Sequence, residues 1–278
     1  MYCYLNGKML PTHEASLGLN DLALLRGYGI FDFFVFEHFH PRFLEDYLDR
    51  FFRSAAYLGL QSPVSRADFR TSILQLIAAN QQEKGGIRLV LTGGYSDDGF
   101  TPGLGNIFIL QSAFVVPPAH QFATGVRVMT YQHQRELPLV KSLNYLTGIN
   151  LLPTLREQEA DFVLFHDGTY VRESDRSNFF IINETGQLVT PKEKVLAGIT
   201  RAKIIELAKA LGIPVAEREI PLEELATARE AFLTSSTKGA LPVTLLDGQP
   251  VGDGQPGPIS QQLQTAFLDL VERSLLVK

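Results

Sequence analysis

A pair of adjacent prolines constrains the organisation of this chain more than any other feature of the sequence. The segment VVPPAHQ, residues 115–121, separates two stretches that are otherwise rich in strand and helix patterns. Proline lacks an amide hydrogen and fixes its own backbone, so a Pro pair can continue neither a helix nor a central strand. The segment is therefore predicted to be a linker between a smaller N-terminal domain, residues 1–114, and a larger C-terminal domain, residues 122–278.

The periodicity of apolar residues predicts a mixture of strands and helices. Runs rich in aromatic and β-branched residues predict strands at 31–36, 87–94, 106–116, 126–131, 161–168 and 178–190. Helical spacing predicts helices near residues 44–58, 69–76, 200–211 and 259–270. Residues 184–186 interrupt the last strand run and are predicted to form a hairpin turn. Since strands and helices do not alternate regularly, the pattern favours an α+β fold over a doubly wound one.

Composition excludes several classes of function. The hydrophobic and charged fractions, 45% and 20%, are those of an ordinary globular protein. A net charge of −5 gives no basic footprint for nucleic acid, and no apolar run approaches the roughly 20 residues of a membrane helix. The N-terminus lacks the pattern of a signal peptide, and the single Cys3 cannot form an internal disulfide. We therefore expect a soluble cytoplasmic protein that binds neither nucleic acid nor membrane.

The histidines give little indication of a metal site. Of the six in the chain, only His38 and His40 lie close together in sequence, and no third ligand is near them. A turn or an edge strand explains the pair better than a metal centre does. We expect no metal.

One lysine stands in an apolar run. Lys141 lies within LPLVKSLNYLTGINLL, residues 137–152. Its stem could cover apolar surface while its ammonium reaches water. Alternatively, apolar surroundings would favour the neutral amine, which is a nucleophile able to form Schiff bases. The segment alone leaves both interpretations open.

Three later segments supply partners for such an amine. Glu173 in VRESDRSNFFIIN is an isolated carboxylate, and VLAGITR opens a helix whose amides and dipole could bind an anion. The third segment, AFLTSSTKGALPV, could supply further donors from its hydroxyls and amides. Each segment also has an ordinary structural explanation, as a solvated carboxylate, a helix start or a capped turn. Together, an amine, a carboxylate and a phosphate cradle are what pyridoxal phosphate requires. The candidate phosphate ligands are Arg50, Gly198, Ile199, Thr200, Ser236 and Thr237.

The order of these segments resembles the fold-type IV pyridoxal-phosphate enzymes. The similarity runs almost from end to end, through RGYGIF at 26–31, DRFFRSA at 49–55 and DGQPVGDGQPGPIS at 247–260. This family contains branched-chain aminotransferases, D-amino-acid transaminases and aminodeoxychorismate lyases. The resemblance implies a small N-terminal α/β domain, a larger C-terminal domain with a barrel-like β core, and a homodimer whose active sites include groups from both subunits.

The resemblance also implies residue roles. Lys141, in the C-terminal domain, would be the Schiff-base lysine and would move the proton between substrate and cofactor. Glu173 would pair with the protonated pyridine nitrogen, while Arg50, Ile199, Thr200 and Thr237 would hold the phosphate. The remaining cofactor contacts would be Tyr145 at the phenolic oxygen, Leu196 on the ring face, and Ser177 and Asn178 beside Glu173.

The resemblance identifies the substrate less directly than it identifies the cofactor. Well-known D-amino-acid transaminases bind the substrate carboxylate with an Arg and a His after the strand that here reads IRLVLTGG, but Gly93 stands at the position of that Arg and no His follows. Phe31 replaces a helping tyrosine. Arg26, Arg88 and Arg176 are the candidate replacements, because an arginine fork recognises carboxylates, although each could instead form a surface ion pair.

Three functions remain at this stage. The first is a transaminase for D-amino acids and 2-oxo acids, with D-glutamate/2-oxoglutarate and D-alanine/pyruvate as substrate pairs. The second is a branched-chain L-amino-acid aminotransferase, with aminodeoxychorismate lyase as a weaker variant. The third, from another class, is a non-catalytic binding protein that keeps the fold.

Overall fold

The chain forms two compact units in a computed structural model that describes residues 1–276. Unit 1 contains Met1–Phe114, Val140–Asn144 and a short C-terminal piece that begins at Ser274. Unit 2 contains Val115–Leu139 and Tyr145–Arg273. The sequence placed Lys141 in the C-terminal domain, whereas its contacts group it with the N-terminal residues. The reason is that residues 140–144 pair with a strand of unit 1.

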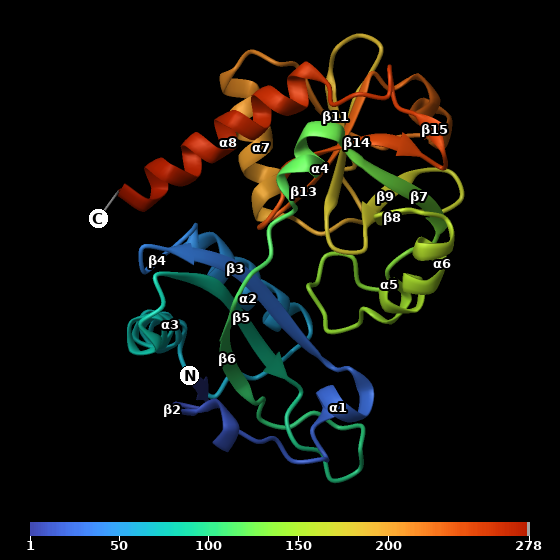
Figure 1. The fold of residues 1–278 in the computed structure, drawn as a ribbon. Coiled ribbons are helices and arrows are strands. Elements are labelled where there is room, and N and C mark those ends of the chain that lie inside the picture. The colour runs from blue at the N-terminus through green and yellow to red at the C-terminus, as the bar shows by residue number, and fades with distance from the viewer. Residues whose placement is uncertain (277–278) are drawn as a thin grey trace. The chain divides into compact units, whose positions relative to one another are not determined.

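Unit 1 is an antiparallel sheet of six strands in the order β2-β1-β6-β5-β3-β4. Helices α2 and α3 pack against the sheet, and Figure 1 shows α2 behind β3 and β5. Its elements are β1 Tyr2–Leu5, β2 Lys8–Pro11, a 3-10 turn at Thr12–Glu14, α1 Leu22–Arg26, β3 Gly29–Glu37, β4 His40–Pro41, α2 Leu44–Tyr57, α3 Arg66–Asn80, β5 Lys84–Thr92 and β6 Ile107–Ser112.

Alternation along β3 and helical spacing along α2 build the core of unit 1. Phe34 and Phe36 are fully buried on β3, and Leu48 and Phe51 of α2 are equally buried. The helix predicted over residues 44–58 is confirmed. It is followed by Gly59 in the left-handed region, with φ of 66°, as a helix stop requires.

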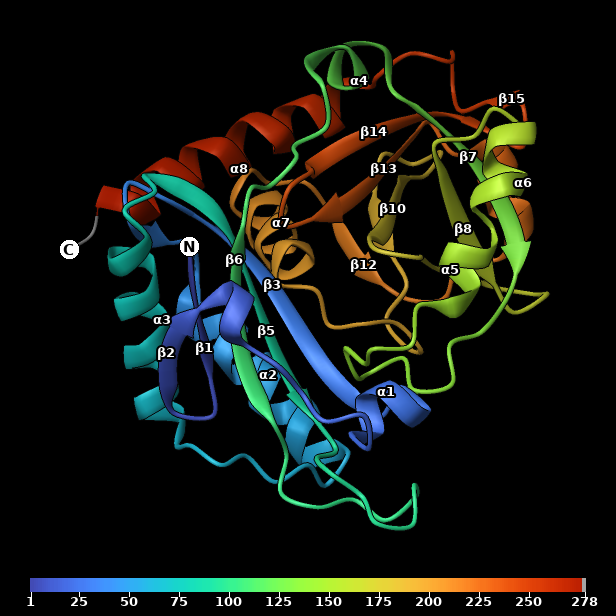
Figure 2. The same cartoon turned by 60° about the horizontal axis from the view of Figure 1, so that its bottom comes forward.

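Unit 2 is a mixed sheet of nine strands in the order β12-β11-β10-β13-β14-β7-β8-β9, with β15 paired to β14. Figure 2 shows the strands curling into a half-barrel, as the resemblance implied, and the α+β class is confirmed. Its elements are α4 Ala119–Thr124, β7 Val126–Gln132, α5 Leu146–Asn150, α6 Leu152–Glu157, β8 Phe162–His166, β9 Val171–Ser174, β10 Asn178–Ile182, β11 Leu188–Thr190, α7 Ile199–Ala210, β12 Val215–Glu217, a 3-10 turn at Leu222–Thr227, β13 Glu230–Ser235, β14 Gly239–Leu246, β15 Gln249–Pro250 and α8 Pro258–Leu276.

The interior of unit 2 is apolar, with Phe179, Leu233 and Leu241 fully buried in one cluster. The hairpin predicted at residues 184–186 is present between β10 and β11. Gly186 adopts a φ of 80° there, which residues with a Cβ rarely do.

Some predicted boundaries shift. The strand predicted over 106–116 ends at Ser112, and the second half of the predicted linker 115–121 already belongs to α4. His38 occupies a left-handed turn, with φ of 48°. Among residues 1–276 no helix is long and apolar enough to cross a membrane, and no cluster of three or more His, Cys, Asp or Glu side chains suits a metal ion.

Candidate active site

The segment that carries Lys141 is an added edge on β3. Ser142 forms an antiparallel bridge with Ile30, the amide of Phe31 donates to the Lys141 carbonyl at 2.9 Å, and the amide of Leu143 donates to the Gly29 carbonyl at 3.0 Å. A Cβ on Gly29 would lie 2.8 Å from the Leu91 carbonyl oxygen on β5 and 2.8 Å from Cδ1 of Leu143, so glycine allows both neighbouring segments to approach β3 closely there. Sheet pairing therefore fixes the backbone of the lysine.

The side chain of Lys141 rests on an aromatic surface. Its Nζ lies 4.7 Å from the centroid of the Phe31 ring. The guanidinium of Arg88, across the ladder on β5, lies 5.5 Å from the same ring and 5.9 Å from that of Phe33. Aromatic faces attract cations electrostatically. Phe31 thus brings together the predicted catalytic lysine and one of the predicted substrate arginines.

Arg50 forms a buried ion pair with Asp32. Nη2 and Nε of Arg50 donate to the two carboxylate oxygens of Asp32 at 2.7 and 2.9 Å, and the side chains are 7% and 0% exposed. Because side chains alternate along a strand, Asp32 projects to the face of β3 opposite Phe31. The pair fixes the orientation of this predicted phosphate ligand.

In unit 2, Glu173 is buried at the end of β9 and is surrounded by donors. Its Oε1 accepts from Nη1 of Arg135 at 2.7 Å. Its Oε2 accepts from the backbone amide of Leu196 at 3.0 Å and from Nδ2 of Asn178 at 3.3 Å. These donors stabilise the negative charge of the carboxylate.

The N-terminus of α7 lies beside this carboxylate network. Gly198 is the N-cap and, as a glycine, has no side chain with which to cap the helix. Nδ2 of Asn178 donates to the Leu196 carbonyl at 2.8 Å, and a Cβ on Gly198 would lie 2.0 Å from Oδ1 of Asn178. Glycine is thus required for the close packing of Asn178. The first amides of a helix, here those of Ile199 and Thr200, are groups that can bind an anion such as phosphate.

Further predicted residues lie nearby in unit 2. Ser177 is buried and accepts a hydrogen bond from Nζ of Lys238 at 3.1 Å. Ser236 and Thr237 are half-buried in the turn between β13 and β14, and Tyr145 is the half-buried N-cap of α5.

Two predicted arginines, Arg26 and Arg176, are exposed and have local partners. Arg26 is exposed at the end of α1, where its Nη1 donates to the Leu25 carbonyl at 3.3 Å. Arg176 is exposed and its Nε pairs with Asp175 at 3.0 Å. Arg176 thus forms a surface ion pair, which is the alternative to carboxylate binding that the sequence had left open.

The charged residues that sequence reasoning missed include Asp32, Arg135 and Lys238, which contact Arg50, Glu173 and Ser177 respectively. Lys238 is buried, and its Nζ lies 4.6 Å from the Phe162 ring. A sequence signal existed for Asp32, since a carboxylate inside the aromatic run FDFFVF needs a buried partner. Arg135 and Lys238 had no comparable signal.

The imidazole of His133 lies close enough to Arg135 to be affected by its charge. Burial, and then the positive charge of Arg135, lower the pKa of His133 below its ordinary value. His133 is therefore neutral at pH 7 and adds no second positive charge beside Arg135.

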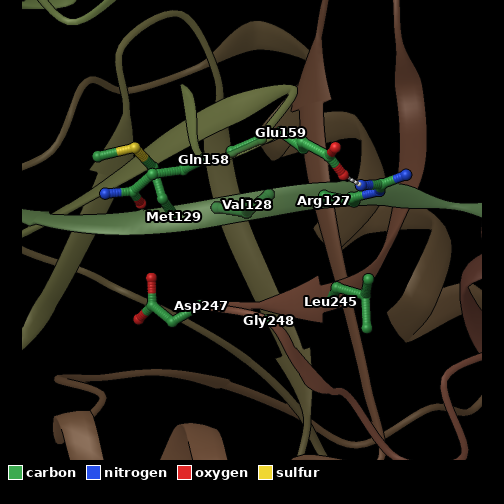
Figure 3. A pocket seen from close by; sticks show the side chains of 9 residues that line it. Arg127, Val128, Met129, Gln158, Glu159, Leu245, Asp247 and Gly248 are labelled. Carbon is green, nitrogen blue, oxygen red and sulfur yellow. Dashed lines mark hydrogen bonds and ion pairs between the residues drawn. The ribbon is translucent and has the colours of Figure 1, made fainter. Parts of the chain in front are cut away.

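Unit 2 also contains a cavity of about 380 Å³. Figure 3 shows Arg127 and Glu159 on one side of it, joined by an ion pair of 2.7 Å, with Asp247 on the other. None of the predicted site residues lines this cavity, so it takes no part in the candidate site.

Comparison with known proteins decides the family. The family model for class IV aminotransferases matches residues 29–246, which include Lys141, Glu173 and the start of α7. The chain belongs to the class IV aminotransferases. It is 29% identical to a D-alanine aminotransferase of Bacillus licheniformis over 94% of both chains. It is 32% identical to a provisionally named branched-chain-amino-acid aminotransferase of Methanocaldococcus jannaschii, over 97% of this chain and 96% of that one.

Solved structures agree with this assignment. The branched-chain amino acid aminotransferase of Escherichia coli is 25% identical and superimposes with a TM-score of 0.90, covering 97% of this chain and 94% of that one. The protein is thus a transaminase that uses pyridoxal phosphate and acts on amino acids and 2-oxo acids. Its own residues fit that cofactor, because a helix start whose N-cap must be glycine lies beside a buried carboxylate held by donors.

Proposed function

We propose that this aminotransferase exchanges the amino group between D-amino acids and 2-oxo acids, with D-glutamate/2-oxoglutarate and D-alanine/pyruvate as the substrate pairs. The observation that carries the proposal is the position of Arg88. Its guanidinium and the amine of Lys141 lie against the same Phe31 ring. A substrate carboxylate bound by Arg88 would therefore lie within reach of the lysine that acts on it.

The surroundings of Gly93 support a carboxylate anchor at another position. A Cβ at Gly93 would lie 2.5 Å from Cδ1 of Tyr28 and 3.2 Å from the side chain of Leu22. No arginine fits there without displacing both neighbours.

The D-alanine aminotransferases among the relatives favour D-amino acids, while the branched-chain names favour the second candidate, a branched-chain L-amino-acid aminotransferase.

The residues have distinct proposed roles toward the cofactor. Pyridoxal phosphate supplies an electron sink next to the substrate Cα. Lys141 holds the cofactor covalently and its Nζ moves the proton at the substrate Cα, while Glu173 keeps the ring nitrogen protonated. The phosphate ligands are Arg50, the helix start at Gly198, Ile199 and Thr200, and the turn residues Ser236 and Thr237. Leu196 packs on the ring, Tyr145 donates to the phenolic oxygen, and Ser177 and Asn178 form the wall beside Glu173.

The functional assembly is proposed to be a cytoplasmic homodimer. Leu24 and Leu25 on α1 and Phe100 in the loop after β5 are 66%, 41% and 79% exposed. Apolar surface of this kind favours burial against another protein surface. Arg26 ends the same helix, so a dimer that covers α1 would carry Arg26 into the neighbouring subunit's site. Light scattering on the eluting protein tests this, and a monomer would remove Arg26 from the site.

Arg88→Ala tests the substrate anchor. The variant should raise KM for D-glutamate at least about tenfold, because a charge-assisted contact contributes about 1.5–3 kcal/mol. Arg70→Ala is the matched control, since Arg70 is an exposed arginine whose Nε pairs with Glu45 at 2.6 Å. The proposal fails if the two variants give the same KM.

A further inference from the structure

Arg135 joins Glu173 to the loop that leads to Lys141. Its Nη1 donates to Oε1 of Glu173 at 2.7 Å and to the Pro138 carbonyl at 3.3 Å, and its Nη2 donates to the Leu137 carbonyl at 3.4 Å. The side chains of Arg135 and Glu173 are only 16% and 7% exposed. One largely buried guanidinium therefore binds both the carboxylate and the loop between β7 and Lys141.

The charge of Arg135 acts directly on the carboxylate of Glu173. Two further donors to Glu173, the Leu196 amide and Asn178, are neutral. Arg172 precedes Glu173 in sequence, so alternation directs it to the opposite face of β9, where it pairs with Asp167 and Glu219. Where water is excluded, a paired cation strongly stabilises the ionised carboxylate over its protonated form.

We propose that Arg135 is a positioning residue that keeps the proton shared by Glu173 and the cofactor's ring nitrogen on the nitrogen. The inference rests on the proposed role of Glu173. Without the charge of Arg135, the carboxylate becomes a stronger base and takes that proton from the nitrogen. The nitrogen then regains its lone pair, Glu173 becomes a neutral acid, and the ring loses the positive charge that makes it an electron sink.

Nuclear magnetic resonance of the holoenzyme shows directly whether the ring nitrogen of the cofactor is protonated. The enzyme is reconstituted with pyridoxal phosphate labelled with nitrogen-15 in the ring, whose chemical shift distinguishes a protonated from an unprotonated ring nitrogen. The variants are Glu173→Gln, Arg135→Gln and Arg135→Lys. Arg127→Gln is the matched control, since Arg127 pairs with Glu159 at the same 2.7 Å but the two side chains are 53% and 78% exposed.

The wild-type enzyme, Arg135→Lys and Arg127→Gln should show a protonated nitrogen. Arg135→Gln should move toward the unprotonated signal of Glu173→Gln. If Arg135→Gln keeps the wild-type signal while Glu173→Gln shows a shifted signal, the proposed role of Arg135 is wrong and the proposed role of Glu173 stands. A wild-type signal in Glu173→Gln overturns the proposed role of Glu173 itself, and the inference with it.

A double variant covers the case in which Arg135→Gln does not fold. Arg135→Met combined with Glu173→Gln removes both charges of this pair, so neither member remains as a buried ion without the other. If Arg135 acts through Glu173, this variant binds pyridoxal phosphate as tightly as Glu173→Gln alone. A further loss of affinity beyond about threefold exceeds the scatter of independent effects, and would mean that Arg135 acts on the cofactor by another route.

Discussion

Removing Arg50 should destabilise the protein far more than removing a surface arginine. The substitution Arg50→Ala leaves the carboxylate of Asp32, which is 0% exposed, without its bidentate partner. Breaking such a buried pair from one side costs about 3–5 kcal/mol. At about 2–4 °C per kcal/mol for a chain of roughly this size, the melting temperature should fall by about 6–20 °C.

Thermal unfolding of the cofactor-free protein at pH 7 measures this effect apart from phosphate binding. Arg66→Ala is the control, because Arg66 pairs with Glu45 and Asp49 at 2.7 and 2.8 Å but is 41% exposed. Exposed pairs contribute about 1 kcal/mol or less. Asp32→Asn combined with Arg50→Gln should recover part of the lost stability. Equal melting temperatures for Arg50→Ala and Arg66→Ala would refute the reasoning.

Three other perturbations test separate parts of the account. Lys141→Ala should abolish transamination but keep the wild-type circular dichroism, since the sheet pairing of this segment with β3 is made by backbone hydrogen bonds that alanine retains. Gly198→Ala should weaken pyridoxal phosphate binding about tenfold in a fluorescence titration, because its Cβ would lie 2.0 Å from Oδ1 of Asn178 and displace the start of α7. Burial raises the pKa of the Asp167 carboxyl, but hydrogen bonds from the Tyr170 amide and Arg172 outweigh it and hold the pKa well below its usual range. The folded-state pKa is depressed, so the stabilisation is present above pH of about 4 and is lost in more acidic solution. In urea denaturation, Asp167→Asn should therefore be less stable by about 1–3 kcal/mol at pH 7, with the difference shrinking below pH of about 4.

Regular elements with strong periodicity could be predicted from the sequence. Helix α2 and strand β3 were found because their buried faces repeat at helical and strand spacing. The hairpin β1–β2 was missed although its turn is Asn6-Gly7, with φ of 47° and 90°. That dipeptide is a strong hairpin signal, but its flanking strands are short and partly exposed.

The site was only partly predictable from the sequence. The resemblance supplied the candidate residues, yet the pairs Arg50–Asp32 and Arg135–Glu173 join positions 18 and 38 residues apart. Such pairs depend on how helices and loops pack against strands, and local spacing carries no record of that packing. Likewise, the attachment of Lys141 to β3 arises from backbone hydrogen bonds, which leave little trace in side-chain identity apart from Gly29.

The most direct test of the central claim is a half-reaction with single enantiomers. The holoenzyme is mixed with D-glutamate, D-alanine, L-glutamate or L-leucine, and loss of the visible absorbance of the bound pyridoxal phosphate is followed in stopped flow. The account predicts faster loss with D-glutamate or D-alanine than with either L-amino acid. Faster reaction with L-leucine would contradict it and assign the enzyme to the branched-chain substrates.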